Sequence, residues 1–578
     1  MDSDSGKDYT EYKRCSNQLR NLTRKATKLF EKNISKNVKK QPKKFWRYVN
    51  SKRSVKAKIP DLHVADDDDP ECMAKTDKQK ANVLADFFSS VMTREMDGVM
   101  KLSNKPEIKE KLIIDINEDL VGKKLSKLKI SKSPGPDTMH PRVLKELKLA
   151  IVKPLTMIFQ TSLETGRLPE VCKQANITAI FKKGSKHLAG NYRPVSLTSV
   201  VCKLLESLIR DCLVKYMKNN GIFSSKQFGF IGGRSTVLQL LKVLDKWTEI
   251  LDNGGCVDVI YCDFMKAFDT VPHNRLISVL EFYGVEGRIL AWIKEFLNNR
   301  KQRVMVNGVP SSWHDVVSGI PQGSVLGPVL FVVYINTLVD EVDHSEVSMF
   351  ADDTKMYKGI FQPPQDNMLL QTDIDNISRW SEGSLLKFHP EKTAAMRITR
   401  SSDLEPPQYT MNNKPLALSD EEKDLGVIID SKLTFEKHIQ AKINKANQIM
   451  GLIRRTIEYL NKENFKLLFT ALVRPHLEYA NAVWSPSLKK HVNALENVQR
   501  RATKYIPGLA NMSYQERLQT LELPTLQYRR YRGDMIEVFK ITHGLYDKCV
   551  TDGFLPMVDI NNKKLWDTSS LYSKEIAI

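Results

Sequence analysis

The sequence predicts an α+β fold in which helices cover an antiparallel sheet. Residues 257–262 form a strand-like run that ends at Asp263, and two further runs, residues 347–351 and 354–357, flank the doublet Asp352-Asp353. An Asp-Asp doublet between two strands is typical of a hairpin turn, because both side chains tolerate unusual backbone angles. Apolar residues at helical spacing lie between these runs and are expected to cover one side of the sheet: Leu276, Leu280, Tyr283, Ile289, Trp292, Ile293 and Phe296.

Length and composition restrict the class of protein. A chain of 578 residues is too long for one compact core and is expected to form several domains. No apolar stretch approaches the roughly 20 residues that span a bilayer, and the polar start has no signal-peptide character. We therefore expect no membrane segment and a nuclear or cytoplasmic location. The eight cysteines form no Cys-x-x-Cys pair, which suits a reducing compartment and argues against zinc knuckles.

The positive charge is concentrated near the amino terminus. Residues 11–58 contain 17 Lys or Arg against two Glu, which accounts for +15 of the chain's formal charge of +20. Phe45, Trp46 and Tyr48 lie among these cations, so the segment is expected to bind phosphates while its rings stack on unpaired bases. The alternative is a solvated, partly helical linker. An acidic stretch, residues 66–70, is expected to separate this arm from the folded body.

Helical spacing and turn residues predict two elements in the first third of the chain. Ala81, Leu84, Ala85 and Phe88 have helical spacing, which predicts a helix over residues 77–90. A Pro/Gly turn then precedes Asp137, which is expected to cap a helix. The apolar stripe expected on this second helix is Val143, Leu144 and Leu147.

A strand and a helix are expected next. Residues 176–181 have strand composition and are followed by Lys182. Gly229 and its neighbouring glycines allow a close backbone approach, and Ser235 or Thr236 is expected to cap the helix that follows. The buried face expected on that helix is Val237, Leu240, Leu241, Leu244, Trp247 and Leu251.

The carboxylates of Asp263 and the Asp352-Asp353 doublet indicate a site that binds divalent cations. Unpaired carboxylates at neighbouring strand ends repel one another, so this arrangement persists mainly where divalent cations and a triphosphate supply the balancing charge. It therefore favours phosphoryl transfer by a polymerase. The alternative for the doublet alone is an ordinary turn in which each side chain caps its own backbone.

Three motifs surround these acidic residues in a definite order. They are Asp-Phe-Met-Lys-Ala-Phe-Asp at 263–269, Gly-Ile-Pro-Gln-Gly-Ser-Val-Leu-Gly-Pro at 319–328 and Phe-Ala-Asp-Asp at 350–353. Further motifs lie at 133–137, 192–197, 227–230, 233–236, 425–427, 477–480, 483–484 and 529–534. With these motifs the chain resembles the reverse transcriptases of non-LTR retrotransposons (the LINE class), jockey-like in character, from about residue 45 to about residue 545. No counterpart of that family's amino-terminal endonuclease is seen in the sequence.

The resemblance implies a right-hand polymerase fold, with fingers, a palm built on the antiparallel sheet and a helical thumb, preceded by a basic helical amino-terminal arm. A strand at 425–429 is expected to form the primer grip, and helices at 435–459 and 464–472 to belong to the thumb. The implied division is a basic arm and linker over 1–65, a helical extension over 66–125, fingers and palm over 126–400, a primer-grip region over 401–430, and a thumb and carboxyl-terminal region over 431–578.

The resemblance also implies a metal site and a catalytic group. Asp263 and Asp352 are expected to hold two Mg²⁺ ions, with Mn²⁺ as an alternative, and Asp353 and the Phe264 carbonyl are expected to complete the ligands. Lys392 resembles the lysine proposed as general acid for pyrophosphate in polymerases. Its neighbours His389 and Thr393 depart from the family pattern.

The same resemblance implies nucleotide-binding residues. Phe268 resembles the steric gate that excludes a ribose 2′-hydroxyl, whereas Asp269 is expected to cap a helix rather than bind metal. Arg234 is expected either to contact template phosphate or to be a free surface arginine. The other residues implied to bind the nucleotide are Lys182, Arg193, Phe264, Ala267, Gln322 and Gly323, and those implied to follow an RNA–DNA duplex are Lys442, Lys445, Arg454 and Arg455.

The implied activity is RNA-directed DNA synthesis on primed RNA. The implied partners are an RNA template, a DNA primer, their hybrid and deoxynucleoside triphosphates, while the oligomeric state is left open. Two alternatives remain at this point: a truncated or domesticated retroelement remnant that binds RNA without catalysis, and an RNA-templated RNA polymerase, whose palm also uses an Asp-Asp turn.

Overall fold

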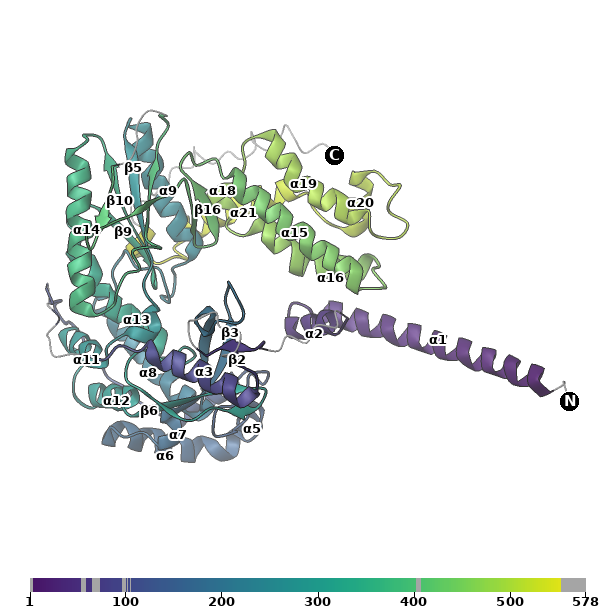
Figure 1. Ribbon diagram of the computed structural model, residues 1–578, viewed down its shortest axis with the longest axis horizontal. Coiled ribbons are helices and arrows are strands. Elements are labelled where there is room, and N and C mark those ends of the chain that lie inside the picture. Colours follow the sequence, from purple (N-terminus) through teal and green to yellow (C-terminus); the bar gives the residue numbers. More distant parts are fainter. Residues whose placement is uncertain are drawn as a thin grey trace. The chain divides into compact units, whose positions relative to one another are not determined.

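Both helices and strands are present along the chain, which confirms the α+β class (Figure 1). The structure is a computed structural model that describes residues 4–52, 59–64, 73–95, 100, 102–103, 105–401 and 407–551. The acidic stretch at 66–70 and the last residues, 552–578, lie outside this description. The chain divides into a major unit, Lys58–Gln239 with Asp245–Glu422, and a minor unit, Met1–Ala57 and Leu240–Leu244 with Lys423–Ile578.

A five-stranded sheet, with strand order β14-β11-β5-β10-β9, forms the centre of the major unit. β5 (Cys256–Cys262) is the middle strand and pairs antiparallel with both β10 (Asp353–Ile360) and β11 (Ala394–Ile398). β9 (Glu346–Phe350) pairs antiparallel with β10, and β14 (Ala417–Leu418) pairs parallel with β11. The strands predicted around Asp263 and the Asp-Asp doublet are therefore confirmed, and they are direct neighbours.

Helices pack on this central sheet through a large apolar core. α11 (His273–Phe282), α12 (Gly287–Leu297), α13 (Gly327–Ile335) and α14 (Gln365–Ser384) contribute buried side chains to it. The residues that the sequence assigned to this role are buried there, except that Ile289 is partly buried: Leu276, Leu280, Tyr283, Trp292, Ile293 and Phe296. Burial of these side chains is the main favourable term that holds the helices on the sheet.

The second sheet of the major unit has the strand order β4-β3-β6-β7, with β8 paired to β6. β3 (Gln174–Phe181) contains the predicted strand. It pairs antiparallel with β4 (Tyr192–Thr198) and parallel with β6 (Arg300–Val306). Lys182 therefore directly follows β3, in the loop that connects β3 to β4.

α3 (Asp77–Ser90) begins and ends at the predicted residues. Thr76 caps it: the Thr76 side chain accepts from the Gln79 N–H, and the Gln79 side chain accepts from the Thr76 N–H. The predicted apolar positions of α3, Leu84 and Phe88 among them, belong to a cluster shared with the second sheet. The helical period and the capping residues therefore agree on this element.

One predicted cap is at the wrong residue. Asp137 does not cap a helix: its Oδ1 accepts from the Met139 N–H in a local turn. The cap of α5 (Pro141–Glu146) is His140, whose Nδ1 accepts from the Arg142 N–H. The predicted stripe is also wrong in part, because Leu144 is buried whereas Val143 and Leu147 are exposed. Pro141, which suits the first position of a helix, sets the start later than Asp137 implied.

The predicted helix after Gly233 is α9 (Thr236–Asp252), and Ser235 caps it by accepting from the Leu238 N–H at 3.1 Å. Trp247 and Leu251 are buried as expected. The remaining elements of the major unit are β1 (Leu62–His63), β2 (Met73–Ala74), α4 (Glu118–Ser126), α6 (Lys148–Thr165), α7 (Glu170–Lys173), η1 (Ala189–Asn191), α8 (Val200–Asn219), α10 (Ala267–Thr270), β7 (Val309–Pro310), β8 (His314–Val316), η2 (Asn336–Glu341), β12 (Thr410–Met411), β13 (Lys414–Pro415) and β15 (Glu421–Asp424).

The minor unit is mostly helical. The helices predicted at 435–459 and 464–472 are present, the second as α16 followed by a π-helical turn, whereas the strand predicted at 425–429 begins later, at Val427. Leu425 and Gly426 have positive φ and form the turn before it. The elements are α1 (Asp4–Asn37), α2 (Pro42–Lys52), β16 (Val427–Asp430), α15 (Glu436–Thr456), α16 (Lys462–Leu468), η3 (Phe469–Val473), α17 (Arg474–Glu478), α18 (Asn481–Trp484), α19 (Lys489–Thr503), α20 (Tyr514–Leu521), α21 (Leu526–Thr542) and α22 (Lys548–Thr551).

The aromatic residues of the basic arm are used largely for packing. Phe45 is completely buried, and the Tyr48 hydroxyl donates to the Glu31 carboxylate at 2.9 Å. The same buried Glu31 accepts from the backbone N–H groups of Glu458 and Tyr459. The expectation that Phe45 stacks on bases is therefore wrong. None of the helices described combines the length and apolarity that crossing a membrane requires.

A buried ion pair joins two strands of the central sheet and provides a stability prediction. Arg397 on β11 donates from Nε and Nη2 to the two oxygens of Asp258 on β5, both at 2.7 Å, and the Tyr409 hydroxyl also donates to Asp258. Asp258→Ala is expected to lower the free energy of unfolding by about 3–5 kcal/mol, because it leaves a buried guanidinium without its partner. Urea denaturation followed by tryptophan fluorescence measures this loss.

Asp252→Ala is the matched control for this prediction. Asp252 pairs with Arg400 on the surface, where both side chains are about two-thirds exposed, so its loss is expected to cost about 0–1 kcal/mol. Equal losses in the two variants would contradict the assignment of Asp258 to the core.

Candidate active site

Neighbouring strands bring the acidic side chains to one end of the central sheet. Cys262, the last residue of β5, pairs with Thr354 of β10, so Asp263, which follows β5, and Asp353, the first residue of β10, lie at the same end of the sheet. Asp352 lies in the tight turn between β9 and β10, next to Ala351, which has a φ of +58°. The predicted proximity of the two acidic segments therefore follows from the antiparallel pairing of β5 with β10.

The turn that carries Asp352 is held in place by Gln227, whose side chain is completely buried. Gln227 Oε1 accepts from the backbone N–H groups of Ala351 at 2.8 Å and Gly229 at 2.7 Å. A Cβ atom on Gly229 would lie 2.3 Å from the Ala351 nitrogen, so glycine is required at this position. The close approach expected of Gly229 is thus to the turn beside Asp352.

The charges of Asp352 and Asp263 act on one another. Burial raises the pKa of the Asp352 carboxyl, and the negative charge of Asp263 raises it further, whereas Arg193 and Lys182 oppose the rise. The net effect is a raised pKa. A divalent cation that binds between Asp352 and Asp263 would stabilise the ionised form of Asp352, which burial and the Asp263 charge disfavour.

This raised pKa leads to a prediction about stability. A carboxyl whose pKa is higher in the folded than in the unfolded protein favours folding when protonated, so ionised Asp352 destabilises the fold at neutral pH. Asp352→Asn is therefore expected to raise the thermal unfolding midpoint at pH 7. The gain should shrink as the pH is lowered through the raised pKa, because wild-type Asp352 is then also neutral.

Differential scanning calorimetry at several pH values, without added metal, measures this effect. Asp375→Asn is the control, because Asp375 is exposed on α14 and its substitution should not move the midpoint. A lower midpoint for Asp352→Asn at pH 7 would show that Asp352 is a structural residue instead.

Cations surround the carboxylates. Lys182 follows β3, and Arg193 of β4 lies opposite Ile180 of β3. Burial and the nearby charge of Arg193 lower the pKa of Lys182, while Asp263 raises it. The predicted cations of this hairpin therefore lie close enough to the carboxylates to interact with them electrostatically.

The segment after α14 holds Asp263 from the other side. Lys392 Nζ lies 3.7 Å from Asp263 Oδ2, with both side chains about half exposed. The His389 N–H donates to the Asp263 carbonyl at 2.7 Å, and the Asp263 N–H donates to Thr393 Oγ1 at 3.4 Å. The two residues that depart from the family pattern thus support the backbone of Asp263.

Mg²⁺ binds few protein carboxylates and retains waters and substrate phosphates as ligands. Across the described residues, no three His, Cys, Asp or Glu side chains lie close enough together to hold a metal ion. Asp263 and Asp352 are nevertheless close enough for their charges to interact, and Asp353 is exposed at the start of β10. Two carboxylates at one end of the central sheet therefore fit metal ions that also bind a triphosphate, but not a closed three-carboxylate cage.

The rings of Phe264 and Phe268 are fixed by stacking. Phe264 stacks on Phe388 with ring centroids 4.4 Å apart, and the backbone hydrogen bonds beside it use the Asp263 carbonyl and the Met265 N–H. Phe268 stacks on Phe331 at 4.2 Å and is partly exposed. A ring held on one face by Phe331 cannot move aside when a larger sugar approaches, which suits the predicted gate.

Lys266 was not singled out from the sequence as a site residue. It has a φ of +48°, and its Nζ lies 3.9 Å from the centre of the Phe87 ring of α3. Burial lowers the pKa of Lys266 to about 8, with Asp269 opposing the shift and Lys392 contributing to it. The left-handed backbone directs this amine to α3, and nothing in the residue pattern signals that conformation.

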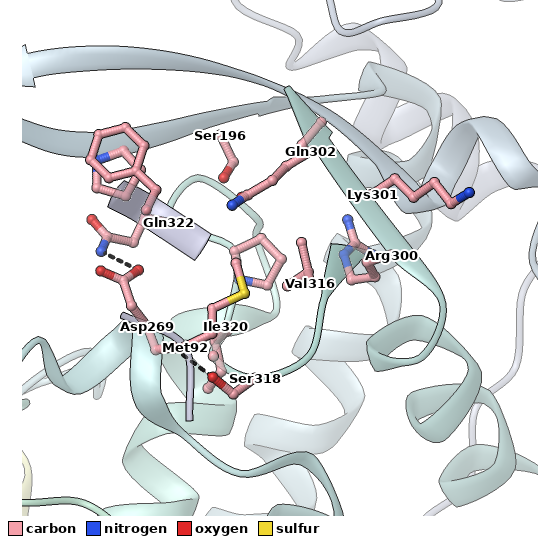
Figure 2. A pocket seen from close by; sticks show the side chains of 15 residues that line it. Met92, Ser196, Asp269, Arg300, Lys301, Gln302, Val316, Ser318, Ile320 and Gln322 are labelled. Atoms are coloured by element: carbon pink, nitrogen blue, oxygen red, sulfur yellow. Dashed lines mark hydrogen bonds between the residues drawn. The ribbon is translucent and has the colours of Figure 1, made fainter. Parts of the chain in front are cut away.

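The loop that carries Gln322 and Gly323 lies beside Asp269. Gln322 Nε2 donates to Asp269 Oδ1 at 2.8 Å (Figure 2). A Cβ atom on Gly323 would lie 2.4 Å from the Ser196 carbonyl oxygen of β4, so glycine is required at this position. Asp269 lies within α10, so its predicted capping role is wrong: the carboxylate binds the Gln322 side chain.

Of the two expectations for Arg234, the free surface arginine is wrong, whereas contact with template phosphate stays a prediction. Arg234 Nη1 donates to the carbonyl oxygens of Ser224 and Gln227, so it braces the segment that supports the Asp352 turn. In the minor unit, Lys442 Nζ donates to the Gly426 carbonyl at 3.0 Å. The expectation that Lys442 follows a duplex therefore competes with a structural role.

Comparisons with known proteins agree with this geometry. A family model described as "Reverse transcriptase (RNA-dependent DNA polymerase)" matches residues 180–456. This range contains both acidic segments, the Gln322 loop and Lys392. Residues 180–456 of this chain therefore form a reverse transcriptase domain.

The similar proteins define the branch, which is that of jockey-like non-LTR retrotransposons. The RNA-directed DNA polymerase from mobile element jockey of Drosophila melanogaster is 29% identical over 398 residues, which are 66% of this chain and 43% of that protein. The probable RNA-directed DNA polymerase from transposon BS of the same species is 26% identical over 460 residues, covering 75% of this chain and 50% of the relative. The chain thus spans about half the length, or less, of these relatives.

Proposed function

We propose that the protein is an RNA-directed DNA polymerase of a LINE-type retrotransposon, which extends a primer 3′-hydroxyl with deoxynucleotides. The observation that supports this proposal most strongly is that Asp263 and Asp352 interact with one another and with Lys182 and Arg193 in a single site. Carboxylates that bind divalent cations, next to side chains that bind a triphosphate, are the two parts that nucleotidyl transfer requires.

The mechanism uses a pair of Mg²⁺ or Mn²⁺ ions. Asp263 and Asp352 would hold them with the Phe264 carbonyl as a further ligand, whereas Asp353, exposed at the start of β10, would contribute its charge nearby. When bound, these ions lower the pKa of the primer hydroxyl and stabilise the leaving pyrophosphate. The raised pKa of Asp352 supports this assignment, because the site disfavours negative charge until a cation is present.

The side chains around the carboxylates bind and select the nucleotide. Arg193 and Lys182 pair with the triphosphate. Lys392, 3.7 Å from Asp263, is placed to give a proton to the departing pyrophosphate. The stacked ring of Phe268 excludes a ribose 2′-hydroxyl, and Gln322 contacts the sugar or the base.

The resemblance assigns parts of a right-hand polymerase to the two units. In this proposal the central sheet is the palm, the second sheet belongs to the fingers, β16 is part of the primer grip, and the helices of the minor unit form the thumb. The partners are an RNA template, a DNA primer, their hybrid and deoxynucleoside triphosphates. The formal charge of +15 over residues 11–58 favours contact with such polyanions.

Primer extension on poly(rA)/oligo(dT) with Mg²⁺ tests the proposal, comparing dTTP with UTP and wild type with Asp352→Asn. DNA synthesis that is lost in the variant supports it. Binding of the duplex without extension by the wild-type protein would select the remnant that binds RNA without catalysis. Equal use of UTP would select an RNA polymerase.

A further inference from the structure

Asp269 has no part in the mechanism above, yet it holds the side chain of Gln322. Asp269 lies in α10, one residue after Phe268, and the two partners are 53 residues apart in sequence. Their hydrogen bond, from Gln322 Nε2 to Asp269 Oδ1, measures 2.8 Å, and Figure 2 shows the two side chains pointing at one another across the edge of a pocket.

The loop before Gln322 is bound to the same short helix, α10, through a side chain and through its backbone. Ser318 Oγ donates to the Asp269 carbonyl at 2.9 Å, and the Ile320 N–H donates to the Phe268 carbonyl at 2.7 Å. A Cβ atom on Gly319 would lie 2.5 Å from the Asp269 carbonyl oxygen. The loop and α10 therefore form one packed element that carries both Phe268 and Gln322.

The carboxylate determines which end of the Gln322 amide faces it. An ionised carboxylate only accepts hydrogen bonds, so it selects the Nε2 end and turns Oε1 away. The main chain of Gln322 is held as well, because its carbonyl accepts from the Ser196 N–H of β4 at 2.9 Å. With its main chain and its Nε2 both held, Gln322 presents Oε1 in one orientation.

We propose that Asp269 is a positioning residue for nucleotide selection, which orients the Gln322 amide so that Oε1 accepts from a hydroxyl or amino group of the incoming nucleotide. The inference rests on the polymerase function proposed above and adds the residue through which Gln322 acts.

Charged groups around Asp269 support this role. Burial raises the pKa of Asp269 to about 6, against the lowering effects of Gln322, Lys266 and Arg193, and Arg300 and Lys301 line the same pocket. Asp269 is therefore ionised at neutral pH. Below about pH 6 an increasing fraction is protonated, and a protonated carboxyl, which donates as well as accepts, no longer selects the Nε2 end.

Steady-state primer extension on poly(rA)/oligo(dT), with the KM for dTTP and kcat measured separately, tests the proposal. Asp269→Leu leaves Gln322 without its acceptor and is expected to raise KM about tenfold while kcat changes less than about threefold. Asp269→Asn retains an acceptor oxygen, so its KM should lie between those of wild type and Asp269→Leu. The wild-type KM should rise as the pH falls through about 6, whereas that of Asp269→Asn should not.

A double-mutant cycle distinguishes positioning from a general structural effect. If Asp269 acts through Gln322, then Asp269→Leu combined with Gln322→Ala has the same KM as Gln322→Ala alone. If the two effects multiply, or if neither Asp269 variant changes KM, the proposal is wrong. Thermal midpoints confirm that each variant is folded, and Asp269→Asn serves as the test if Asp269→Leu does not fold.

Failure of the polymerase proposal gives a different result. If wild-type protein does not extend the primer, the equilibrium affinity for dTTP, measured on the primed template with Ca²⁺ in place of Mg²⁺, replaces KM in the same cycle. An Asp269→Leu protein that binds dTTP as tightly as wild type, or a wild type that does not bind it, would overturn the assignment of Asp269.

Discussion

Asp263→Asn is expected to reduce the rate of primer extension by about 1,000-fold or more, which corresponds to a loss of ~4 kcal/mol of transition-state stabilisation. The neutral amide is a poor ligand for a hard divalent cation, and it also removes one of the two charges that make the site favourable for such an ion. Single-turnover extension with dTTP and Mg²⁺ measures the chemical step directly. The affinity for primed template should change little, because Asp263 carries no contact proposed for nucleic acid.

A control variant shows whether the loss of rate is specific to Asp263. Asp375→Asn removes an exposed carboxylate of α14 and should extend at the wild-type rate. If Asp263→Asn retains more than about a tenth of wild-type activity, the metal assignment at the end of β5 is wrong.

Phe268→Ala is expected to relax the choice of sugar, with the discrimination between dTTP and UTP falling about 100-fold. The Phe268 ring excludes a ribonucleotide because it would collide with the ribose 2′-hydroxyl. The Phe331 ring lies 4.2 Å behind the Phe268 ring, so the gate cannot retreat from a 2′-hydroxyl. Removing the ring opens the space, and the gain should appear in kcat/KM for UTP rather than as a loss for dTTP.

Phe361→Ala is the matched control, because Phe361 is an exposed phenylalanine of the same unit. It should leave sugar discrimination unchanged. Unaltered discrimination in Phe268→Ala as well would mean that another residue excludes ribose.

The elements that could be predicted from the sequence have local signals. α3 was predicted to the residue from the helical spacing of its apolar side chains, and in the structure the capping pair Thr76 and Gln79 fixes its start. β5 and the β9–β10 hairpin were predicted for a similar reason: apolar runs flank an Asp-Asp turn. The candidate site residues were assigned through a family resemblance, and the motifs that carry this resemblance are each contiguous in sequence.

The parts that escaped prediction depend on partners distant in sequence. Asp269 was interpreted as a helix cap because Asp is common at helix starts, whereas its partner Gln322 is 53 residues away. Nothing in the sequence indicated that Arg234 Nη1 donates to two backbone carbonyls, those of Ser224 and Gln227. The left-handed backbone of Lys266 has no signature in its residue type, so its contact with Phe87 could not be predicted.

The parallel pairing of β3 with β6 has a practical consequence for producing shorter versions of this protein. The residues of β3 that pair with β6 are Gln174 to Ile177, and all of them precede residue 180, where the match to the reverse transcriptase family begins. A fragment trimmed to the matched range would therefore lose the strand that joins the two halves of the second sheet, as well as the α3 side chain that receives Lys266. Recombinant versions intended for activity assays should start before residue 58, where the major unit itself begins.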